Sequence, residues 1–208
     1  MRLGTPNLSA FCMEVDEGST QSGDARRSLV QAAVDLLAER GPDGVSGREI
    51  ADRAGVNYGL IHYYFGGKKG LFEAALDHLR NSYVERLDQA TGQNEWALVP
   101  PDETLARVFA FAALSSSGLL NQTSTFPAME RVRKLVAESL DQPEDHFEVR
   151  TRAAFWAAAR LGWTIFEDFV SDAMEIPEAE QSAARAHVLA LLQDLATGSP
   201  RTNGSSPA

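Results

Sequence analysis

A seven-residue segment in the first third of the chain carries side chains suited to binding nucleic acid. Residues 57–63 are Asn-Tyr-Gly-Leu-Ile-His-Tyr, and with Ile61 turned into a core, the amide, phenol and imidazole groups share an outer surface. Such groups form hydrogen bonds with base edges and phosphate oxygens. Gly59 costs roughly 1 kcal/mol in helix propensity, but it removes a side chain where a helix would meet a groove. The segment therefore predicts a nucleic-acid contact.

The residues before this segment predict the first helix and the turn of a helix-turn-helix. Ser46-Gly-Arg-Glu49 is a capping box, in which the Ser hydroxyl and the Glu carboxylate bond to each other's backbone amides. The helix that it opens turns Ile50 and Ala51 inward and ends at Gly55. After one turn, Asn57 is placed to cap a second short helix. Two short helices joined by a glycine turn are typical of this motif, and the second would present residues 57–63.

The rest of the chain predicts an all-α protein of about nine helices. A helix over residues 24–40 ends at Gly41-Pro42, and a long helix covers residues 68–90. Four further helices are expected near residues 102–119, 127–141, 144–175 and 178–196. The polar ends, residues 1–23 and 197–208, are expected to be a disordered arm and tail. Met13 could be an alternative start, which leaves open whether residues 1–12 belong to the native product.

The charge of the chain is unevenly distributed. The formal net charge is −10, but residues 24–70 hold seven Lys or Arg against six Asp or Glu. The negative charge therefore lies on the remainder, where salt screening over roughly 8 Å hides it from a distant DNA surface. No stretch is long and apolar enough to predict a membrane span or a signal peptide. One cysteine, Cys12, forms no internal disulfide, which fits the cytoplasm.

Residues 27–76 resemble the N-terminal DNA-binding domain of TetR-family transcriptional regulators. The resemblance rests on a continuous pattern of small, capping and apolar residues: Ala32-Ala33, Gly41, Ser46, Ile50-Ala51, Ala54-Gly55-Val56, Gly59, Phe65, Lys68 and Leu71. It implies a three-helix DNA-binding domain over residues 24–70 and a helical ligand-binding and dimerisation domain over residues 71–196. It also implies that the partners are double-stranded operator DNA, a small-molecule effector and a second copy of the chain.

The resemblance also implies roles for single residues. Arg48 is placed to reach a base edge, for which a guanine is the best bidentate match. The positions expected to contact bases and backbone on the second helix, or to complete its outer face, are Asn57, Tyr58, Gly59, Leu60 and His62. The expected phosphate contacts are Ser46, the amide of Gly47, Tyr63 and Lys68. His62 stands where the family often has Tyr, and Gly67 stands where Ser or Thr usually caps the next helix.

Bulky apolar residues of the second domain suggest a ligand cavity. The strongest candidates are Phe109, Met129, Trp156 and Trp163, joined by Phe126, Phe155 and Phe166. Plain core packing is the alternative for each of them alone. Because the domain is acidic, we expect a flat hydrophobic effector that is neutral or cationic rather than a small anion. Arg107 and Arg160 lie near the aromatic residues in sequence, and either could pair with a carboxylate.

Small residues on the last two helices predict a dimer interface. The candidates are Ala157, Gly162, Ala186, Leu189 and Ala190, in a four-helix arrangement with a second copy. Taken together, these features predict a TetR-type repressor that a small hydrophobic effector releases from a palindromic operator. An activator or a ligand-independent regulator of the same fold remains an alternative, as does an all-helical enzyme. No catalytic residue, metal site, cofactor or membrane partner is predicted.

Overall fold

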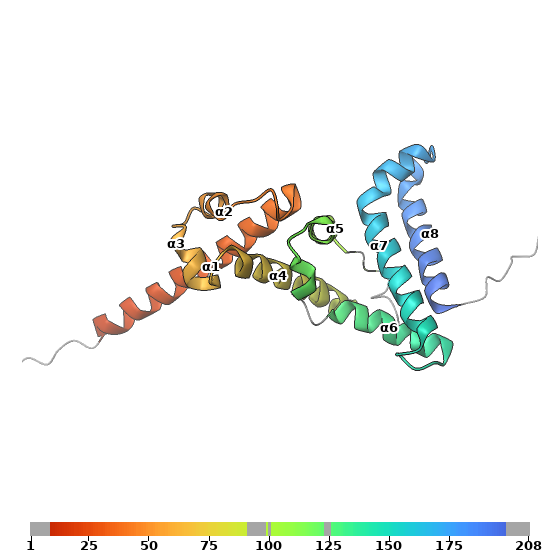
Figure 1. Ribbon diagram of the computed structural model, residues 1–208, viewed down its shortest axis with the longest axis horizontal. Coiled ribbons are helices and arrows are strands. Elements are labelled where there is room, and N and C mark those ends of the chain that lie inside the picture. Colours follow the sequence, from red (N-terminus) through yellow and green to blue (C-terminus); the bar gives the residue numbers. More distant parts are fainter. Residues whose placement is uncertain (1–8, 91–98, 100, 123–125, 199–208) are drawn as a thin grey trace, which may run out of the picture. The chain divides into compact units, whose positions relative to one another are not determined.

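The structure is a computed structural model that describes residues 9–90, 99, 101–122 and 126–198. Side chains are described from Ser22 onward, except at residues 121, 122 and 197. Within these ranges every regular element is a helix, as the sequence predicts (Figure 1). The helices are α1 (Ser9–Arg40), α2 (Gly47–Ala54), α3 (Gly59–Phe65), α4 (Lys68–Gln89), α5 (Glu103–Leu114), the 3-10 helix η2 (Leu119–Gln122), α6 (Pro127–Leu140), α7 (Phe147–Ala173) and α8 (Glu178–Thr197). None of the described helices could cross a membrane.

The chain forms two compact units, each described by itself below. The first contains the residues up to His78 together with Phe111–Leu119, and the second contains Leu79–Ala110 and the residues from Leu120 onward. The predicted boundary at residues 70 and 71 lies near the start of α4, whereas the units separate within α4, which continues to Gln89 without a break. Helix α5 likewise contributes its first residues to the second unit and its end to the first.

The first unit is built on an apolar stripe of α1. The stripe consists of Leu29, Ala33, Leu36 and Leu37, all of which are buried, at the i, i+4, i+7 and i+8 spacing of one helix face. Helix α1 packs against α2 and α3. It begins at Ser9 rather than at residue 24, so it enters the segment predicted as a disordered arm. No proline lies between Ser9 and Arg40 to end it sooner.

Capping interactions define both ends of α2, with side chains at its start and a glycine at its end. The Ser46 hydroxyl accepts from the Glu49 amide at 3.3 Å, and the Ser46 amide donates to the Glu49 carboxylate at 2.8 Å, which confirms the predicted capping box. At the other end Gly55 has φ of 68°, a left-handed conformation that glycine adopts without strain. Helix α2 therefore begins and ends where the sequence predicts.

The second unit has a core made by α6, α7 and α8. Its fully buried centre includes Val136 and Val149, with Trp156, Leu192 and Ala196 packed around them. Pro127 stands in the first turn of α6, where its fixed φ suits a helix start. Helix α7 begins at Phe147, three residues later than predicted, because His146 still belongs to a turn in which its amide donates to the Pro143 carbonyl at 2.9 Å. The predicted tail from residue 199 onward, like residues 1–8, lies outside the described residues.

The capping box makes the stability of the first unit sensitive to acid. Hydrogen bonds from the Ser46 backbone and hydroxyl, followed by the Arg40 guanidinium at 2.9 Å, lower the pKa of Glu49 from 4.5 to about 2. A lowered folded-state pKa contributes stability that is present above pH 4.5 and is lost as the pH falls toward 2. Glu49→Gln should therefore lower the melting temperature at pH 7, and the difference from the wild type should shrink between pH 4.5 and 2.5. Thermal unfolding across that range measures it.

Asp43→Asn is the matched control, since Asp43 is an exposed acid outside the capping box. A melting-temperature difference for Glu49→Gln that stayed constant from pH 7 to 2.5 would contradict the assignment of this acid sensitivity to Glu49.

Candidate nucleic-acid interface and ligand cavity

The outer surface of α3 carries aromatic side chains that the core does not use. Tyr63 is 78% exposed and Tyr58 is 42% exposed, while Ile61 on the opposite side is fully buried. His62 is also exposed, and its ring meets the Tyr58 ring edge to face at 5.7 Å between centroids. The structure therefore brings the predicted contact residues of α3 onto one exposed face, with Leu60 half-buried at its edge.

Asn57 and Gly59 shape the start of α3. The Asn57 side-chain oxygen accepts from the Gly59 amide at 2.8 Å, but the residue at the N-cap position of α3 is Tyr58, so Asn57 shapes the turn before the helix and is not the cap that the sequence predicts. A Cβ atom at Gly59 would lie 3.1 Å from that same oxygen. Glycine at this position therefore avoids crowding the Asn57 oxygen in the turn.

Gly47 has a steric role that sequence reasoning missed. It is buried, and a Cβ atom there would lie 2.9 Å from Cε2 of Tyr58, closer than real Cβ contacts come. The absence of a side chain at residue 47 therefore leaves room for the Tyr58 ring against the first turn of α2, and a larger residue there would displace the ring. A small residue directly after the Ser46 cap was the available signal for this contact.

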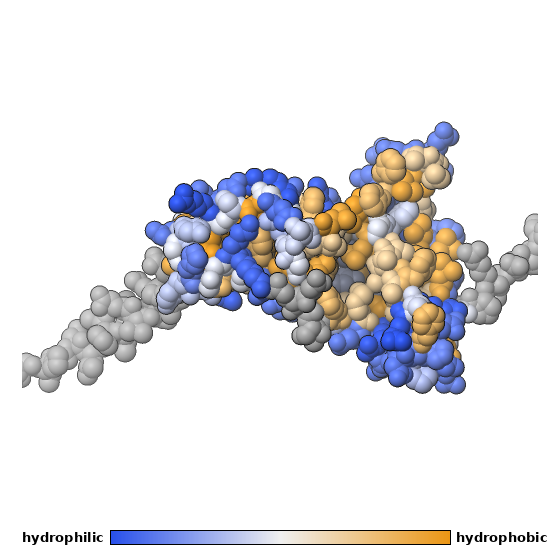
Figure 2. Space-filling view, in the orientation of Figure 1, coloured by the Kyte–Doolittle hydropathy of each residue, from blue (hydrophilic) through white to orange (hydrophobic). Residues whose placement is uncertain are grey.

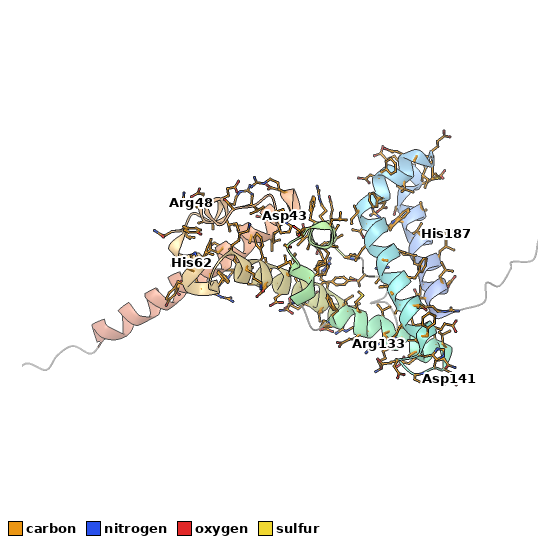
Figure 3. The ribbon with its side chains drawn as sticks, viewed as in Figure 1. Asp43, Arg48, His62, Arg133, Asp141 and His187 are labelled. Carbon is orange, nitrogen blue, oxygen red and sulfur yellow. The ribbon has the colours of Figure 1, made fainter. Side chains whose placement is uncertain are left out.

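The cations of the first unit divide into paired and unpaired groups. Arg40 forms an ion pair with Glu49, and Arg53 donates to both carboxylate oxygens of Glu39 at 3.1 and 3.2 Å. Arg48 is exposed, and within the described part of the chain it has no ion pair or hydrogen bond. Figure 3 places Arg48 on α2 and His62 on the neighbouring α3. The free guanidinium is available to a polyanion.

Lys68 is held at the first residue of α4. Its ammonium donates to the Pro42 carbonyl at 3.3 Å and lies 5.1 Å from the centre of the Phe72 ring. Lys69, the next residue, forms an ion pair with Glu73 at 3.9 Å. The exposed Lys68 therefore lies on an amino-terminal helix end, which also favours an anion.

The second unit contains a mostly apolar cavity. Its empty space measures about 570 Å³ when the part open to solvent is included. Four of the predicted residues line it: Phe109, Phe126, Met129 and Trp156. The wall also includes Arg80 and Tyr83 of α4, which sequence reasoning missed because nothing in α4 distinguished them from its surface and core residues.

The other three predicted pocket residues do not line this cavity. Trp163 borders a second hollow with Thr164 and Leu189, whereas Phe155 and Phe166 are 55% and 57% exposed. Helical rotation of about 100° per residue explains their exposure, because Phe155 and Phe166 both lie roughly a quarter-turn to the same side of Trp156. Those aromatic residues belong to the outer face of α7.

The predicted interface residues are placed differently from one another. Gly162 borders open space, Ala186 and Ala190 are exposed, and Leu189 is half-buried beside the second hollow. Ala157 does not reach the outer face, because it is only 9% exposed and forms part of the cavity wall.

Figure 2 shows apolar residues gathered over the α7 and α8 region of the second unit. Phe169, which is 71% exposed, extends this outer apolar face of α7.

The two arginines that could pair with a ligand carboxylate differ in exposure and in their partners. Arg107 is exposed and forms an ion pair with Glu103 at 2.9 Å. Arg160 is buried, and it borders both the apolar cavity and the second hollow.

Comparison with known proteins gives a consistent set of relatives. The family profile described as "Bacterial regulatory proteins, tetR family" matches residues 29–75, which include all of α2 and α3. The chain is 33% identical over 167 residues to the HTH-type transcriptional repressor Rv3405c of Mycobacterium tuberculosis, a match that spans 77% of this chain and 83% of that protein. It is 38% identical over 85 residues to the HTH-type transcriptional regulator BetI of Brucella anthropi, across 41% of this chain and 42% of that protein.

A solved structure resembles the chain over most of its length. It is a transcriptional regulator from Rhodococcus sp. RHA1, with a TM-score of 0.55 and 28% identity, and the match covers 81% of this chain and 96% of that one. The names of these three relatives all describe transcriptional regulators, and none names an enzyme.

Proposed function

Because the chain belongs to the TetR family and is a DNA-binding transcriptional regulator, we propose that it is a repressor released from a palindromic operator by a small apolar effector. The observation that carries this proposal is the pairing of an exposed polar face on α3 with a separate apolar cavity in the second unit. We assign DNA binding to residues 24–70 and effector binding and dimerisation to residues 71–196. Such a regulator acts in the cytoplasm and needs no catalytic group or cofactor.

In this proposal α2 and α3 divide the DNA contacts between them. Arg48 contacts a base edge, and Tyr58, Gly59 and His62 contact bases and backbone in the major groove. Ser46, the Gly47 amide, Tyr63 and Lys68 hold phosphates, which position the protein without selecting sequence. The unpaired state of Arg48 supports its role, since it loses no ion pair on binding DNA.

A second copy of the chain supplies the other half of the operator contact. The outer face of α7 presents Phe155, Phe166 and Phe169 with Gly162 among them, and α8 presents Ala186 and Ala190. Water contact with this much apolar surface is unfavourable, and large exposed apolar patches mark association sites. Pairing α7 and α8 with their symmetry mates in a four-helix interface would cover it.

Effector binding would act through α5. Phe109 lines the cavity, and two residues further on, Phe111 packs against Gly41, where a Cβ atom would lie 3.1 Å from the Phe111 ring. An effector that displaces Phe109 would move α5. Because Phe111 lies on the same helix, its packing against Gly41 would change as well. A coupling of roughly 1–3 kcal/mol between effector and DNA is typical of such switches.

The first test separates base contacts from phosphate contacts. A nuclease footprint of the DNA upstream of the gene for this protein should show a protected inverted repeat, with half-sites about one helical turn apart. Arg48→Ala should cost roughly 1–3 kcal/mol and relax preference at one operator position, whereas Lys68→Ala should weaken all sequences alike and reduce the salt dependence. Lys69→Ala is the control, because Lys69 already pairs with Glu73. Identical profiles for Arg48→Ala and Lys68→Ala across operator variants would refute the division of roles.

The second test concerns the dimer. Gly162→Asp and Ala190→Asp place a charge on the outer faces of α7 and α8, where a partner would bury it without a counter-ion. Both variants should be monomeric by light scattering and should bind the operator weakly. Gln142→Asp, on an exposed turn after α6, should remain dimeric. Dimers of wild-type stability from both Asp variants would move the interface elsewhere.

The third test asks whether the cavity controls DNA binding. In a screen of planar apolar compounds, at least one should release the operator, and Phe109→Ala should raise the required concentration about tenfold or more, since it removes cavity contacts. Operator affinity without effector should change less than twofold. Leu114→Ala, on the exposed end of the same helix, should behave as the wild type. If no compound releases the operator, a ligand-independent regulator becomes the better description.

A further inference from the structure

Arg160 lies in the middle of α7 with its guanidinium closed off from water. The residue is 2% exposed, and among the described residues none of its three nitrogens, Nε, Nη1 and Nη2, has a hydrogen-bond partner. Buried polar groups nearly always have such partners, and buried charges are normally paired. A buried guanidinium with no acceptor is therefore an exception, and a bound molecule with an acceptor group would complete it.

Arg160 is surrounded by groups that do not neutralise its charge. Its guanidinium lies 4.9 Å from the centre of the Trp156 ring. The phenol of Tyr83 is close enough to act on it electrostatically, but that hydroxyl donates its proton to the Val99 carbonyl at 3.0 Å, and as an uncharged acceptor it meets none of the three guanidinium nitrogens with good hydrogen-bond geometry. Burial lowers the pKa of Arg160, yet an arginine side chain remains protonated in proteins.

Three of the nearby carboxylates are paired with other cations. Asp102 pairs with Arg86, Glu103 with Arg107 and Glu167 with Arg185. Among the described residues that line the apolar cavity, two are arginines and none is Asp or Glu. The cavity therefore has an apolar wall with no carboxylate among its described residues and with the Arg160 guanidinium buried behind it, although the chain as a whole is strongly acidic.

A second unpaired donor lies on the same helix. The indole Nε1 of Trp163 is buried without a hydrogen-bond partner, and both Trp163 and Arg160 border the second hollow. That hollow also has Asp168 and the paired Glu103 and Glu167 in its wall, with Arg185 beside them. Two buried donors without acceptors, three residues apart on α7, suit an oxygen-rich head group at the Arg160 end of the hollow.

We propose that the effector is an amphipathic carboxylate, with an apolar body in the cavity and its carboxylate paired to the Arg160 guanidinium. A carboxylate matches the guanidinium best, because its two oxygens can accept two parallel N–H hydrogen bonds. This inference rests on the proposed effector cavity and reverses the charge preference that the acidic composition suggested. The apolar body would contact Trp156, Phe109 and Phe126, which are already in the wall.

The test uses three probes that share one apolar body and differ only in head group. They are 2-naphthylacetate, 2-(2-naphthyl)ethanol and 2-(2-naphthyl)ethylamine, titrated into the full-length wild-type protein by calorimetry. The carboxylate should bind at least tenfold more tightly than the alcohol, and the amine should bind most weakly. Arg160→Met, of similar length but uncharged, should lose this preference by weakening the carboxylate at least tenfold while leaving the alcohol unchanged. Arg160→Lys should restore part of it.

Two controls keep the result interpretable. Arg107→Met removes an exposed, paired arginine outside the cavity wall and should leave all three affinities unchanged. Melting temperatures of the Arg160 variants check folding, and Arg160→Lys serves as the reference if Arg160→Met does not fold. Equal binding of the carboxylate and the alcohol by the wild type, or a carboxylate preference that survives in Arg160→Met, would overturn the inference and leave the cavity standing. Binding of none of the three probes would count against the effector cavity itself.

Discussion

Two of the helices on which DNA binding depends are too short to be stable alone. Helix α2 has eight residues and α3 has seven, whereas isolated helices of fewer than about 12 residues are marginal in water. Their positions therefore depend on the burial of Ile50 and Ile61 in the core of the first unit, to which the apolar stripe of α1 also belongs. Because those two side chains fix the rotation of each helix, the polar faces of α2 and α3 are directed outward. The buried stripe matters to DNA binding as much as the exposed side chains do.

Helix α7 also has two faces with different roles, and its rotation decides which residues lie on each. Trp156 and Arg160 are four residues apart, about one turn, and both border the cavity. Phe155, Gly162 and Phe166 lie around the helix on the outer side, where apolar residues remain exposed. The helix that bounds the cavity is thus also the helix that we propose to meet the second copy. An occupant that moves α7 would act on the dimer as well as on α5.

The net charge of the chain differs from the charge of the residues around the cavity. The chain carries a formal charge of −10, but many of its acids lie at the surface in ion pairs such as Glu148 with Arg152 and Asp88 with Arg131. Water and salt screen those charges over a short distance. Arg160 has no such screening, because it is buried without an acceptor. In the proposal of a carboxylate effector, this single desolvated cation outweighs a distant surplus of hydrated anions.

What the sequence determined by itself was local. The capping box at Ser46 and Glu49, the turn at Gly55 and the stripe of α1 follow from hydrogen bonds and spacings within a few residues, so they could be predicted. The helix start at Ser9 was missed because the polar composition of residues 1–23 favours disorder, and the start at Phe147 was missed because His146 still belongs to a turn.

The tertiary structure alone decided which side chains meet. It placed Phe109, Phe126, Met129 and Trp156 in one wall, turned Phe155 and Phe166 outward, and drew Ala157 into the cavity. It also left Arg160 without an acceptor while pairing Arg107 with Glu103. The physical reason is that local periodicity fixes the face of a helix on which a residue lies. The segments that cover that face, and so its burial and its partners, come from distant parts of the chain.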